Sequence, residues 1–401
     1  MSFDPSKFDP HAPAFIADPY PTYAQFRAQA PAWRVTFKVG PYTLYDSTWI
    51  FRYADVKRIL DAKALFVKNK NPKHVSPAPF DVLQNMPNGL FSLDPPRHAE
   101  LRSILDPLFA RAIDGMDAEA AKIAKPYLDA AKANRRIELV SAYAMPVPSN
   151  ILRIVLGITD DDWAGIEQWV TGVVRGNDYT QPRATQAMAG TCAMALGSYF
   201  QALTRGCPMH AEKGRMVDLM VESTGIEREE TQMTLVNLAV AGYMSTVFLV
   251  ATGTLNLLKN PAQLALLRKQ PELMAKAIEE MLRYDAPAQL ADRFCAEDTE
   301  IAGVKLKKND QVTAVLGSAN RDSDAFPNAD TFDITRDDKV EHVGFGDGIH
   351  YCLGAPLVRM GAPVTFRMLL EGLPEMKLDG IPQWQTDPYL RSVVNLPLAI
   401  E

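Results

Sequence analysis

The cysteine at position 352 lies in a short segment whose residue types suit a metal-bound thiolate. The chain reads Phe345-Gly346-Asp347-Gly348-Ile349-His350-Tyr351-Cys352-Leu353-Gly354 at this point. Glycine adopts positive φ angles readily, which a tight turn around a sulfur atom requires. A helix with Pro356 in its first turn is predicted directly after Cys352. The free N–H groups and positive dipole end of that helix would stabilise a thiolate. The alternatives are a structural cysteine in a glycine-rich turn and a nucleophilic cysteine, for which no base with a suitable motif is present.

The segment around Cys352 resembles the cysteine-ligand loop of the cytochrome P450 family, whose pattern is F-x-x-G-x-(H/R)-x-C-x-G. All five fixed positions match, from Phe345 to Gly354. The resemblance implies that Cys352 ligates the iron of haem b and that Phe345 packs against the porphyrin. Thiolate ligation pushes electron density toward the iron and favours cleavage of the O–O bond. Other family landmarks follow in order from about residue 15 to residue 400, so the chain is identified as a member of this family.

Haem carries two propionates, which need cationic or hydrogen-bonding partners. His98 and Arg102 lie in a segment that resembles the family's D-P-P-x-H-x-x-x-R helix start. They are four residues apart and therefore project from one face of the predicted helix. The resemblance also assigns Arg293 and His350 to the propionates. Without the neighbouring motif, the pair at 98 and 102 would be read as an ordinary surface pair.

Glu280 and Arg283 match the family's E-x-x-R, and residues at i and i+3 share a helix face. The motif alone carries little information, because many helices contain such pairs. The resemblance implies a buried pair that braces the cysteine loop through a downstream arginine, here Arg336. Its role is structural, not catalytic.

The segment Ala241-Gly242-Tyr243-Met244-Ser245-Thr246 resembles the family's oxygen-activation motif, A-G-x-(E/D)-T-(T/S). The resemblance implies catalytic roles for Ala241, Gly242, Ser245 and Thr246. A glycine inside a helix costs about 1 kcal/mol relative to alanine, so Gly242 indicates a gain elsewhere. The family uses this position to open a groove for dioxygen. The alternative is a small-residue contact within a packed helix.

Two positions of this motif depart from the family. Met244 replaces the acid and Ser245 replaces the threonine of a pair that relays protons during O–O cleavage. Ser245 keeps a hydroxyl, whereas Met244 cannot carry a proton. Water with Ser245 could suffice, a substrate hydroxyl could complete the relay, or the chemistry could need less proton control, as in peroxide-driven oxidation or radical coupling. Monooxygenation is favoured because a hydroxyl remains.

The candidate substrate pocket is mostly apolar. Asn237, Ala241 and Ser245 share one helical stripe at i, i+4 spacing, with Leu238 beside it. Asn237 either anchors a substrate oxygen or faces a neighbouring helix. The resemblance adds pocket positions elsewhere in the chain, which are Phe80, Leu90, Ala288, Leu290 and Val393. Such a lining predicts a hydrophobic organic substrate of low charge.

Composition excludes several other classes of protein. The 401 residues are 47% hydrophobic and 22% charged, with a net charge of −6, which argues against disorder and against nucleic-acid binding. Four cysteines are too few for a secreted scaffold that is held together by disulfides, and the six histidines form no zinc motif. The apolar stretch 233–258 is interrupted by polar residues and reads as a buried core helix rather than a membrane span. The amino terminus lacks signal-peptide features, so a cytoplasmic location is expected.

Helical patterns dominate the chain, and no linker or repeat divides it. A mainly α fold with small β regions is therefore expected, as a single domain over 1–401, and the resemblance implies the cytochrome P450 fold. The β-rich parts are predicted near 35–60, 295–320 and 375–401, with strands at Tyr42–Tyr45, Thr48–Tyr53, Glu300–Val304, Gln311–Val315 and Val393–Ile400. The predicted helices are Pro19–Ala30, Arg97–Ala112, Met116–Lys132, Ser149–Leu156, Asp160–Arg175, Thr185–Arg205, Arg228–Lys259, Pro261–Gln270 and Pro271–Tyr284.

Local signals refine several of these helices. Pro107 and Pro126 predict kinks or breaks in two of them. Thr159 and the acidic residues after it predict a helix start, and Gly176 a helix stop.

No nucleotide-binding G-x-G-x-x-G follows a strand, so electrons must come from a separate donor. The resemblance implies a ferredoxin with its ferredoxin reductase, with dioxygen as co-substrate. Two competing hypotheses remain. One is a non-catalytic haem-binding sensor or carrier, and the other is a haem-free helical enzyme that uses Cys352 as a nucleophile.

Overall fold

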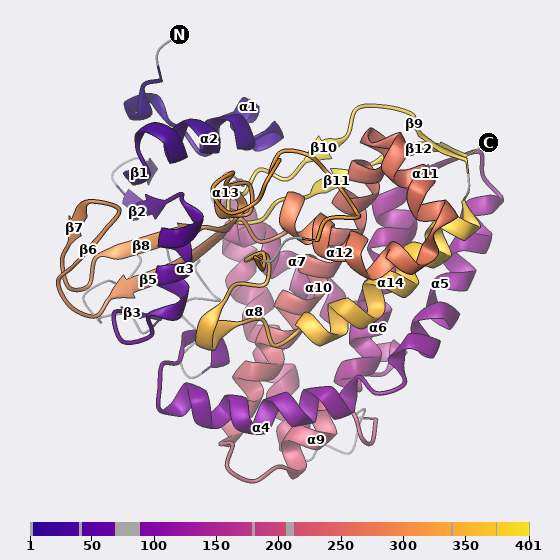
Figure 1. Ribbon diagram of the computed structural model, residues 1–401. Coiled ribbons are helices and arrows are strands. Elements are labelled where there is room, and N and C mark those ends of the chain that lie inside the picture. The colour runs from indigo at the N-terminus through magenta and orange to yellow at the C-terminus, as the bar shows by residue number, and fades with distance from the viewer. Residues whose placement is uncertain are drawn as a thin grey trace. The chain divides into compact units, whose positions relative to one another are not determined.

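The computed structural model describes residues 3–39, 42–68, 89–178, 181–205, 212–337, 340–373 and 375–400. Helices dominate these residues and the sheets are small (Figure 1), which confirms the predicted mainly α fold. The chain groups into two compact units, each built from three separate stretches. The first comprises Met1–Pro79, Glu279–Cys352 and Trp384–Ser392, and the second comprises Phe80–Ile278, Leu353–Gln383 and Val393–Glu401.

The first unit is built around a five-stranded sheet with the order β1-β2-β8-β5-β3. The central pair, β2 and β8, is parallel, with Thr48 opposite Val312, whereas β1 and β5 are antiparallel to their neighbours. The strands are β1 (Ala32–Val39), β2 (Tyr42–Ile50), β3 (Phe66–Val67), β5 (Leu290–Cys295) and β8 (Gln311–Val315), with a separate hairpin of β6 (Thr299–Ile301) and β7 (Val304–Leu306). Short helices accompany the sheet, namely η1 (Pro5–Lys7), α1 (Pro13–Ala17), α2 (Tyr20–Gln29), α3 (Tyr53–Asp61), α13 (Leu316–Ala319) and η5 (Gly348–His350).

The core of this unit extends from the sheet to the start of the cysteine loop. Ile59 and Leu60 of α3 pack with Val312 and Ala314 of β8, and Val343 belongs to the same buried cluster. The cysteine loop therefore begins next to this buried apolar cluster. Helix α12 (Met274–Tyr284) begins in the second unit and ends in the first.

The second unit contains the long helices. They are α4 (Arg97–Ala112), α5 (Met116–Lys132), α6 (Pro146–Leu156), α7 (Asp160–Asn177), α8 (Arg183–Thr204), α9 (Met216–Glu222), α10 (Arg228–Lys259), α11 (Pro261–Lys269) and α14 (Ala355–Gly372). Shorter helical turns are η2 (Leu90–Ser92), η3 (Val140–Ala144) and η4 (Pro271–Leu273). A three-stranded sheet pairs β4 (Arg136–Glu138), β12 (Pro397–Ile400) and β9 (Met376–Leu378), and the remaining strands are β10 (Gln383–Trp384) and β11 (Val393–Asn395).

Helix α10 spans residues 228–259 as predicted from the sequence. It starts with a reciprocal capping box between Glu227 and Glu230, which satisfies backbone donors that its first turn leaves free. Among the described residues it is the one helix long and apolar enough to cross a membrane, and 61% of its most apolar window is buried inside the protein. The burial supports the prediction of a core helix.

Several local expectations were wrong. The strand expected over Thr48–Tyr53 ends at Ile50, because the Tyr53 N–H donates to the Asp322 carboxylate at 2.8 Å and α3 begins there. Gly176 lies inside α7 rather than ending it, since a Cβ at this position would be 2.3 Å from Ala189 Cβ of α8.

Other local expectations concerned a helix cap, two prolines inside helices and the last strand. The Thr159 side chain makes no capping hydrogen bond, although α7 does start after it. Neither Pro107 nor Pro126 breaks its helix. The strand expected over Val393–Ile400 is divided at Leu396, whose N–H donates to Glu138 Oε1 at 2.7 Å.

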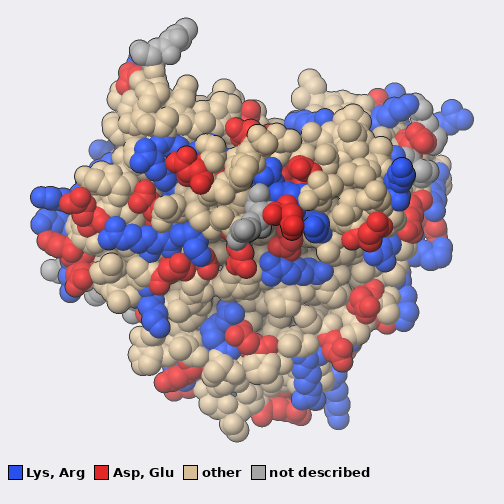
Figure 2. All heavy atoms as spheres, viewed as in Figure 1, with Lys and Arg blue, Asp and Glu red and all other residues tan. Residues whose placement is uncertain are grey.

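Basic and acidic side chains are interspersed on the face of the molecule shown in Figure 2. No large field of one sign is visible there.

Candidate functional site

The cysteine loop has the tight geometry that its glycines predict. Gly346 has a φ of 72° and Gly348 a φ of 64°, both in the left-handed region. The Cys352 N–H donates to the Phe345 carbonyl at 3.0 Å, which closes the loop onto its own start. Cys352 is half-buried, and α14 follows with Pro356 in its first turn. The cysteine therefore precedes a helix amino terminus, where a thiolate is favoured.

Helix α3 holds the middle of this loop. A Cβ at position 348 would lie 2.4 Å from the Leu60 carbonyl oxygen, so only glycine fits there. The Asp347 carboxylate caps the Gly348 N–H at 2.7 Å and forms an ion pair with Lys57 of α3. The pairing of Asp347 with Lys57 could not be predicted from the sequence, because it joins segments far apart in the chain.

Glu280 and Arg283 form a buried bidentate ion pair. Arg283 donates to the two carboxylate oxygens of Glu280 at 2.7 and 2.9 Å, and both side chains are at most 3% exposed. Arg336 Nε lies 3.2 Å from the same carboxylate. The sequence pattern had grouped these three residues, and the structure places them together.

Asn320 links the buried ion pair to the cysteine loop. Arg283 Nη1 donates to the Asn320 carbonyl at 2.8 Å, and the Asn320 side chain accepts the Val343 N–H at 2.7 Å. Val343 lies two residues before Phe345, so the brace reaches the loop through this asparagine. No local pattern in the sequence marks these contacts of Asn320.

The candidate propionate partners belong to both units. In the first unit, Arg293 lies on β5 and is 3% exposed, and its Nη1 donates to the Asp292 carbonyl at 2.8 Å. His350 ends η5 and is half-buried. In the second unit, His98 is 2% exposed in the first turn of α4, and Arg102 forms a 2.9 Å ion pair with Asp106 one turn later. The chemistry of this set, one thiolate with two arginines and two imidazoles, fits a dianionic haem.

The middle of α10 presents an accessible stripe on an otherwise buried helix. The residues of this stripe that remain accessible are Leu238, Ala241, Gly242, Met244, Ser245 and Thr246. The Ser245 hydroxyl donates to the Ala241 carbonyl at 2.8 Å, and the Thr246 hydroxyl lies 3.3 Å from the Gly242 carbonyl. The Ser245 proton is therefore used within its own helix, and the hydroxyl oxygen can still accept hydrogen bonds from a ligand or water.

Gly242 allows α10 to approach α6 closely. A Cβ at this position would lie 3.0 Å from Leu152 Cδ1. This contact with the end of the Leu152 side chain supports the packing alternative for Gly242.

The opposite face of α10 is fixed by a carboxylate. Tyr243 donates to Glu167 Oε1 of α7 at 3.1 Å, and Ser149 of α6 donates to the same oxygen at 2.7 Å. Burial raises the pKa of Tyr243 well above its usual range. Positions 243 and 245 are about 200° apart around a helix. Glu167 thus lies behind the accessible stripe and does not replace the acid missing at position 244.

The other candidate pocket residues of the second unit are buried. Asn237 is 4% exposed, and its Nδ2 would be 2.4 Å from a Cβ at Gly89, so it faces the turn that leads into η2 rather than a long helix. Leu90 follows in η2 and is 9% exposed. Val393 is fully buried, and its N–H donates to Thr252 Oγ1 of α10 at 3.3 Å.

Two further candidates belong to the first unit, and one is not described. Leu290 starts β5 and is 6% exposed, and Ala288 forms an isolated bridge with Leu390. Phe80 lies outside the described residues.

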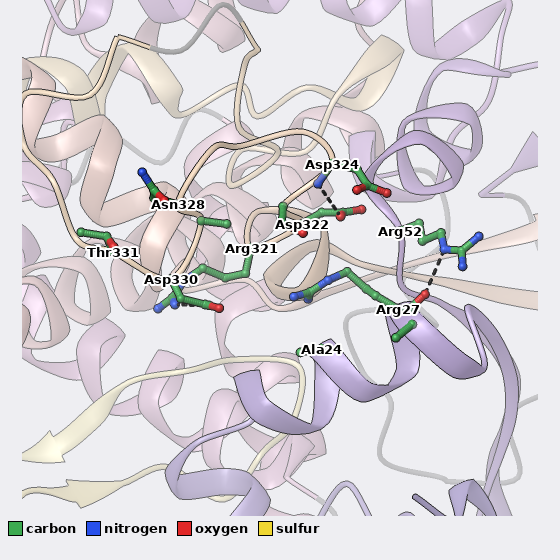
Figure 3. Close-up of a pocket in the computed structure, with 12 residues that line it drawn as sticks. Ala24, Arg27, Arg52, Arg321, Asp322, Asp324, Asn328, Asp330 and Thr331 are labelled. Carbon is green, nitrogen blue, oxygen red and sulfur yellow. Dashed lines mark hydrogen bonds and ion pairs between the residues drawn. The ribbon is translucent and has the colours of Figure 1, made fainter.

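A groove in the first unit, shown in Figure 3, contains none of the predicted site residues. It is lined by Ala24, Arg27, Ala28, Arg52, Arg321, Asp322, Ser323, Asp324, Asn328, Ala329, Asp330 and Thr331. Its charges are balanced, and Arg321 donates to Asp330 at 2.9 Å. This lining is unlike the apolar pocket that the sequence predicts for the substrate.

Among the described residues, the two cysteines other than Cys352 are packing residues. Burial raises the pKa of the Cys295 thiol to about 11 and also raises that of Cys192. Both therefore remain protonated at neutral pH, as expected for inert buried thiols. Cys207 lies outside the described residues.

Comparisons with known proteins agree on one family. A family model described as cytochrome P450 matches residues 211–374. The chain is 33% identical to cytochrome P450 monooxygenase PikC of Streptomyces venezuelae, covering 96% of this chain and 91% of the relative. It is 29% identical to the biotin biosynthesis cytochrome P450 of Bacillus subtilis, covering 96% and 97%. A crystal structure of P450BioI in complex with an acyl carrier protein ligated by hexadec-9Z-enoic acid superimposes with a TM-score of 0.87, at 28% identity, covering 97% of this chain and 100% of that one.

Proposed function

The chain belongs to the cytochrome P450 family and is a P450 monooxygenase, and we propose that it inserts one oxygen atom into a hydrophobic small organic molecule with electrons from a separate donor protein. The observation that carries this proposal is the closed loop at Cys352, with its two left-handed glycines and the helix that follows. Haem iron with a cysteine thiolate supplies the activation of dioxygen when it is bound.

The residues proposed to hold haem b have different roles toward the iron, the porphyrin and the propionates. The Cys352 thiolate would ligate the iron, Phe345 would pack against the porphyrin, and Gly354 is the N-cap residue of α14. His98, Arg102, Arg293 and His350 bind the propionates by charge and hydrogen bonding. His98 and Arg293 are buried, whereas Arg102 and His350 are half-buried, and their side chains are the cationic and hydrogen-bonding types that propionates take as partners.

Proton delivery is assigned to Ser245 acting with ordered water. Its hydroxyl proton points back to Ala241, so its oxygen can accept a hydrogen bond from a water in the pocket. Met244 cannot donate a proton, and Glu167 lies on the other face of the helix. Dioxygen and water would meet the accessible stripe from Ala241 to Thr246.

The substrate is proposed to be largely apolar with one uncharged polar group. Leu90, Leu238 and Ala241 offer an apolar lining, and the buried amide of Asn237 offers a hydrogen bond to a substrate oxygen. Relatives support an apolar substrate. P450BioI is in complex with an acyl carrier protein ligated with hexadec-9Z-enoic acid, and a second neighbour at 28% identity, CYP267B1, is in complex with myristic acid.

A ferredoxin with its ferredoxin reductase is the proposed electron source, and the cytoplasm the proposed location. The chain contains no nucleotide-binding fingerprint of its own. Neither nucleic acid nor membrane is part of the proposal, and the buried state of α10 supports this for membranes.

The experiment that tests the proposal is the spectrum of the reduced, carbon monoxide-bound protein. We expect a strongly red-shifted Soret band that is lost in Cys352→Ala. Cys295→Ala is the matched control, because it removes a buried thiol that is protonated at neutral pH, and it should keep the band. A histidine-type band, or a red-shifted band that survives in Cys352→Ala, would overturn thiolate ligation by Cys352.

Met244 favours a second candidate, peroxide-driven oxidation, which needs less control of proton delivery because the peroxide brings its own protons. Turnover with hydrogen peroxide alone, compared with turnover on a ferredoxin, its reductase and NADPH, separates the two. A higher rate with peroxide would favour this second candidate.

A further inference from the structure

His342 stands at the start of the cysteine loop and uses both of its ring nitrogens. Nε2 lies 3.0 Å from Glu279 Oε2 on α12, and Nδ1 accepts the Gly344 N–H at 3.0 Å. The side chain is 10% exposed, and its ring lies 6.0 Å from the ring of Phe345. Neither His342 nor Glu279 received a role from the sequence.

These two contacts fix one tautomer of the imidazole. Nδ1 must carry a lone pair because it accepts a backbone N–H, so the ring proton lies on Nε2 and is donated to Glu279. The peptide held in this way has little freedom. A Cβ at Gly344 would lie 2.7 Å from the Leu282 carbonyl oxygen, so the chain is confined between the end of α12 and the imidazole.

The confined peptide leads directly to the residue that closes the loop. Gly344 is followed by Phe345, whose carbonyl accepts the Cys352 N–H at 3.0 Å. The direction of that carbonyl depends on the Gly344 backbone, and the direction of the Cys352 backbone depends on the carbonyl. A change at His342 is therefore transmitted to the sulfur through two peptide groups.

We propose that His342, oriented by Glu279, is a positioning residue for the cysteine ligand. It holds the Gly344 N–H so that Cys352 presents its sulfur in the geometry that retains a thiolate bond. This inference rests on the proposed ligation of iron by Cys352. It adds a hydrogen-bond relay from α12 that is separate from the Glu280–Arg283–Asn320 brace.

Three variants divide the relay into its parts. His342→Leu removes both hydrogen bonds. His342→Asn keeps an acceptor that can reach the N–H two residues later, as asparagine does in Asx turns, but no longer reaches Glu279. Glu279→Gln keeps an oxygen acceptor for Nε2–H and removes only the charge.

The readout is the ratio of the red-shifted to the ordinary Soret band in the reduced, carbon monoxide-bound protein, measured well below the unfolding temperature of each variant. Loss of both bonds in His342→Leu should lower this ratio by about tenfold. His342→Asn should recover most of the ratio, and Glu279→Gln should stay within about twofold of the wild type.

Two outcomes would overturn the inference. In one, His342→Leu keeps the wild-type ratio. In the other, His342→Asn is as impaired as His342→Leu, which would mean that the bond to Gly344 is not what matters. A wild-type protein without any red-shifted band would instead refute the proposed function, so the two failures are distinguishable.

Discussion

The cysteine loop and the middle of α10 carry the two halves of the proposed chemistry, and they are held in different ways. The loop is fixed by other elements, through Lys57 to Asp347, Asn320 to Val343 and Glu279 to His342. In the middle of α10, the hydroxyls of Ser245 and Thr246 bond to carbonyls of their own helix.

This difference reflects what each region must do. A loop with two left-handed glycines loses much backbone entropy when it is ordered, because glycine is the most flexible residue, and surrounding contacts must offset that loss. A site that handles water and protons needs polar groups that can exchange partners. We therefore expect substitutions in the loop to cost stability and substitutions in the middle of α10 to alter chemistry.

The largest effect is expected from Arg283→Ala in the brace of the loop. The variant removes the bidentate partner of a buried carboxylate and leaves only Arg336 beside it, and breaking a buried ion pair typically costs about 3–5 kcal/mol. Arg283 also donates to the carbonyls of Asn320 and Ala329, and those bonds are lost as well. The measurement is the free energy of unfolding of the haem-loaded protein in urea.

Lys122→Ala is the control for this change, because Lys122 pairs with Glu119 on the exposed face of α5 and its side chain is 71% exposed. Surface pairs contribute at most about 1 kcal/mol. Equal losses for the two variants would contradict the view that the brace is special.

A pair of glycine variants separates strain from contact within the loop. Gly346→Ala and Gly348→Ala both place a Cβ at positive φ, which costs about 1–2 kcal/mol. Only the Cβ at 348 would also meet a backbone oxygen, that of Leu60 at 2.4 Å, whereas at 346 the nearest atom is 3.8 Å away. Crowding adds about 1–3 kcal/mol.

We therefore expect Gly348→Ala to unfold at lower urea concentration than Gly346→Ala, and to retain less haem. If the two variants were equally stable, contact with α3 would not hold the loop.

Features that a local sequence pattern marks could be predicted, whereas features that tertiary contacts decide could not. Cys352, α4 and α10 could be recognised because their signals are local, namely a ten-residue pattern, a helix start and a long apolar run closed by Asn260 and Pro261. Gly176 and the strand end at Ile50 were misjudged because tertiary contacts decided them, with Ala189 in one case and with the start of α3 in the other.

The contacts of the site could not be predicted for a related reason. Asn320, His342 and Glu167 act through partners between 23 and 76 residues away in the chain. Single residues of these types occur throughout any sequence, and nothing local marks which of them will meet. Geometry was needed to identify them.

A smaller effect is expected at the start of α10, where Glu230 is held by Arg97 of α4 in a bidentate pair. The hydrogen bond from Arg97 lowers the pKa of Glu230. A lowered folded-state pKa contributes stability that is present above the unfolded value of about 4.3 and is lost as the pH falls through the folded value.

Glu230→Gln should therefore be less stable than the wild type by about 1–3 kcal/mol at pH 7. The gap should shrink as urea unfolding is repeated below about pH 4. A gap that stays constant across this range would show that the carboxylate charge contributes nothing.

The smallest change in stability, and the most informative change in chemistry, is expected from Met244→Glu. The position is partly accessible on the same face of α10 as Ser245, so a carboxyl group fits without burial of a charge, and the stability should change by no more than about 0.5 kcal/mol. A positioned acid typically contributes about 10²-fold or more to proton transfer. If protons limit the reaction, product formed per NADPH consumed should rise in Met244→Glu and stay unchanged in Met244→Leu. An equal yield of product per NADPH in all three proteins would mean that water and Ser245 already deliver protons fast enough. The accessible stripe of α10 would then need no acid at position 244.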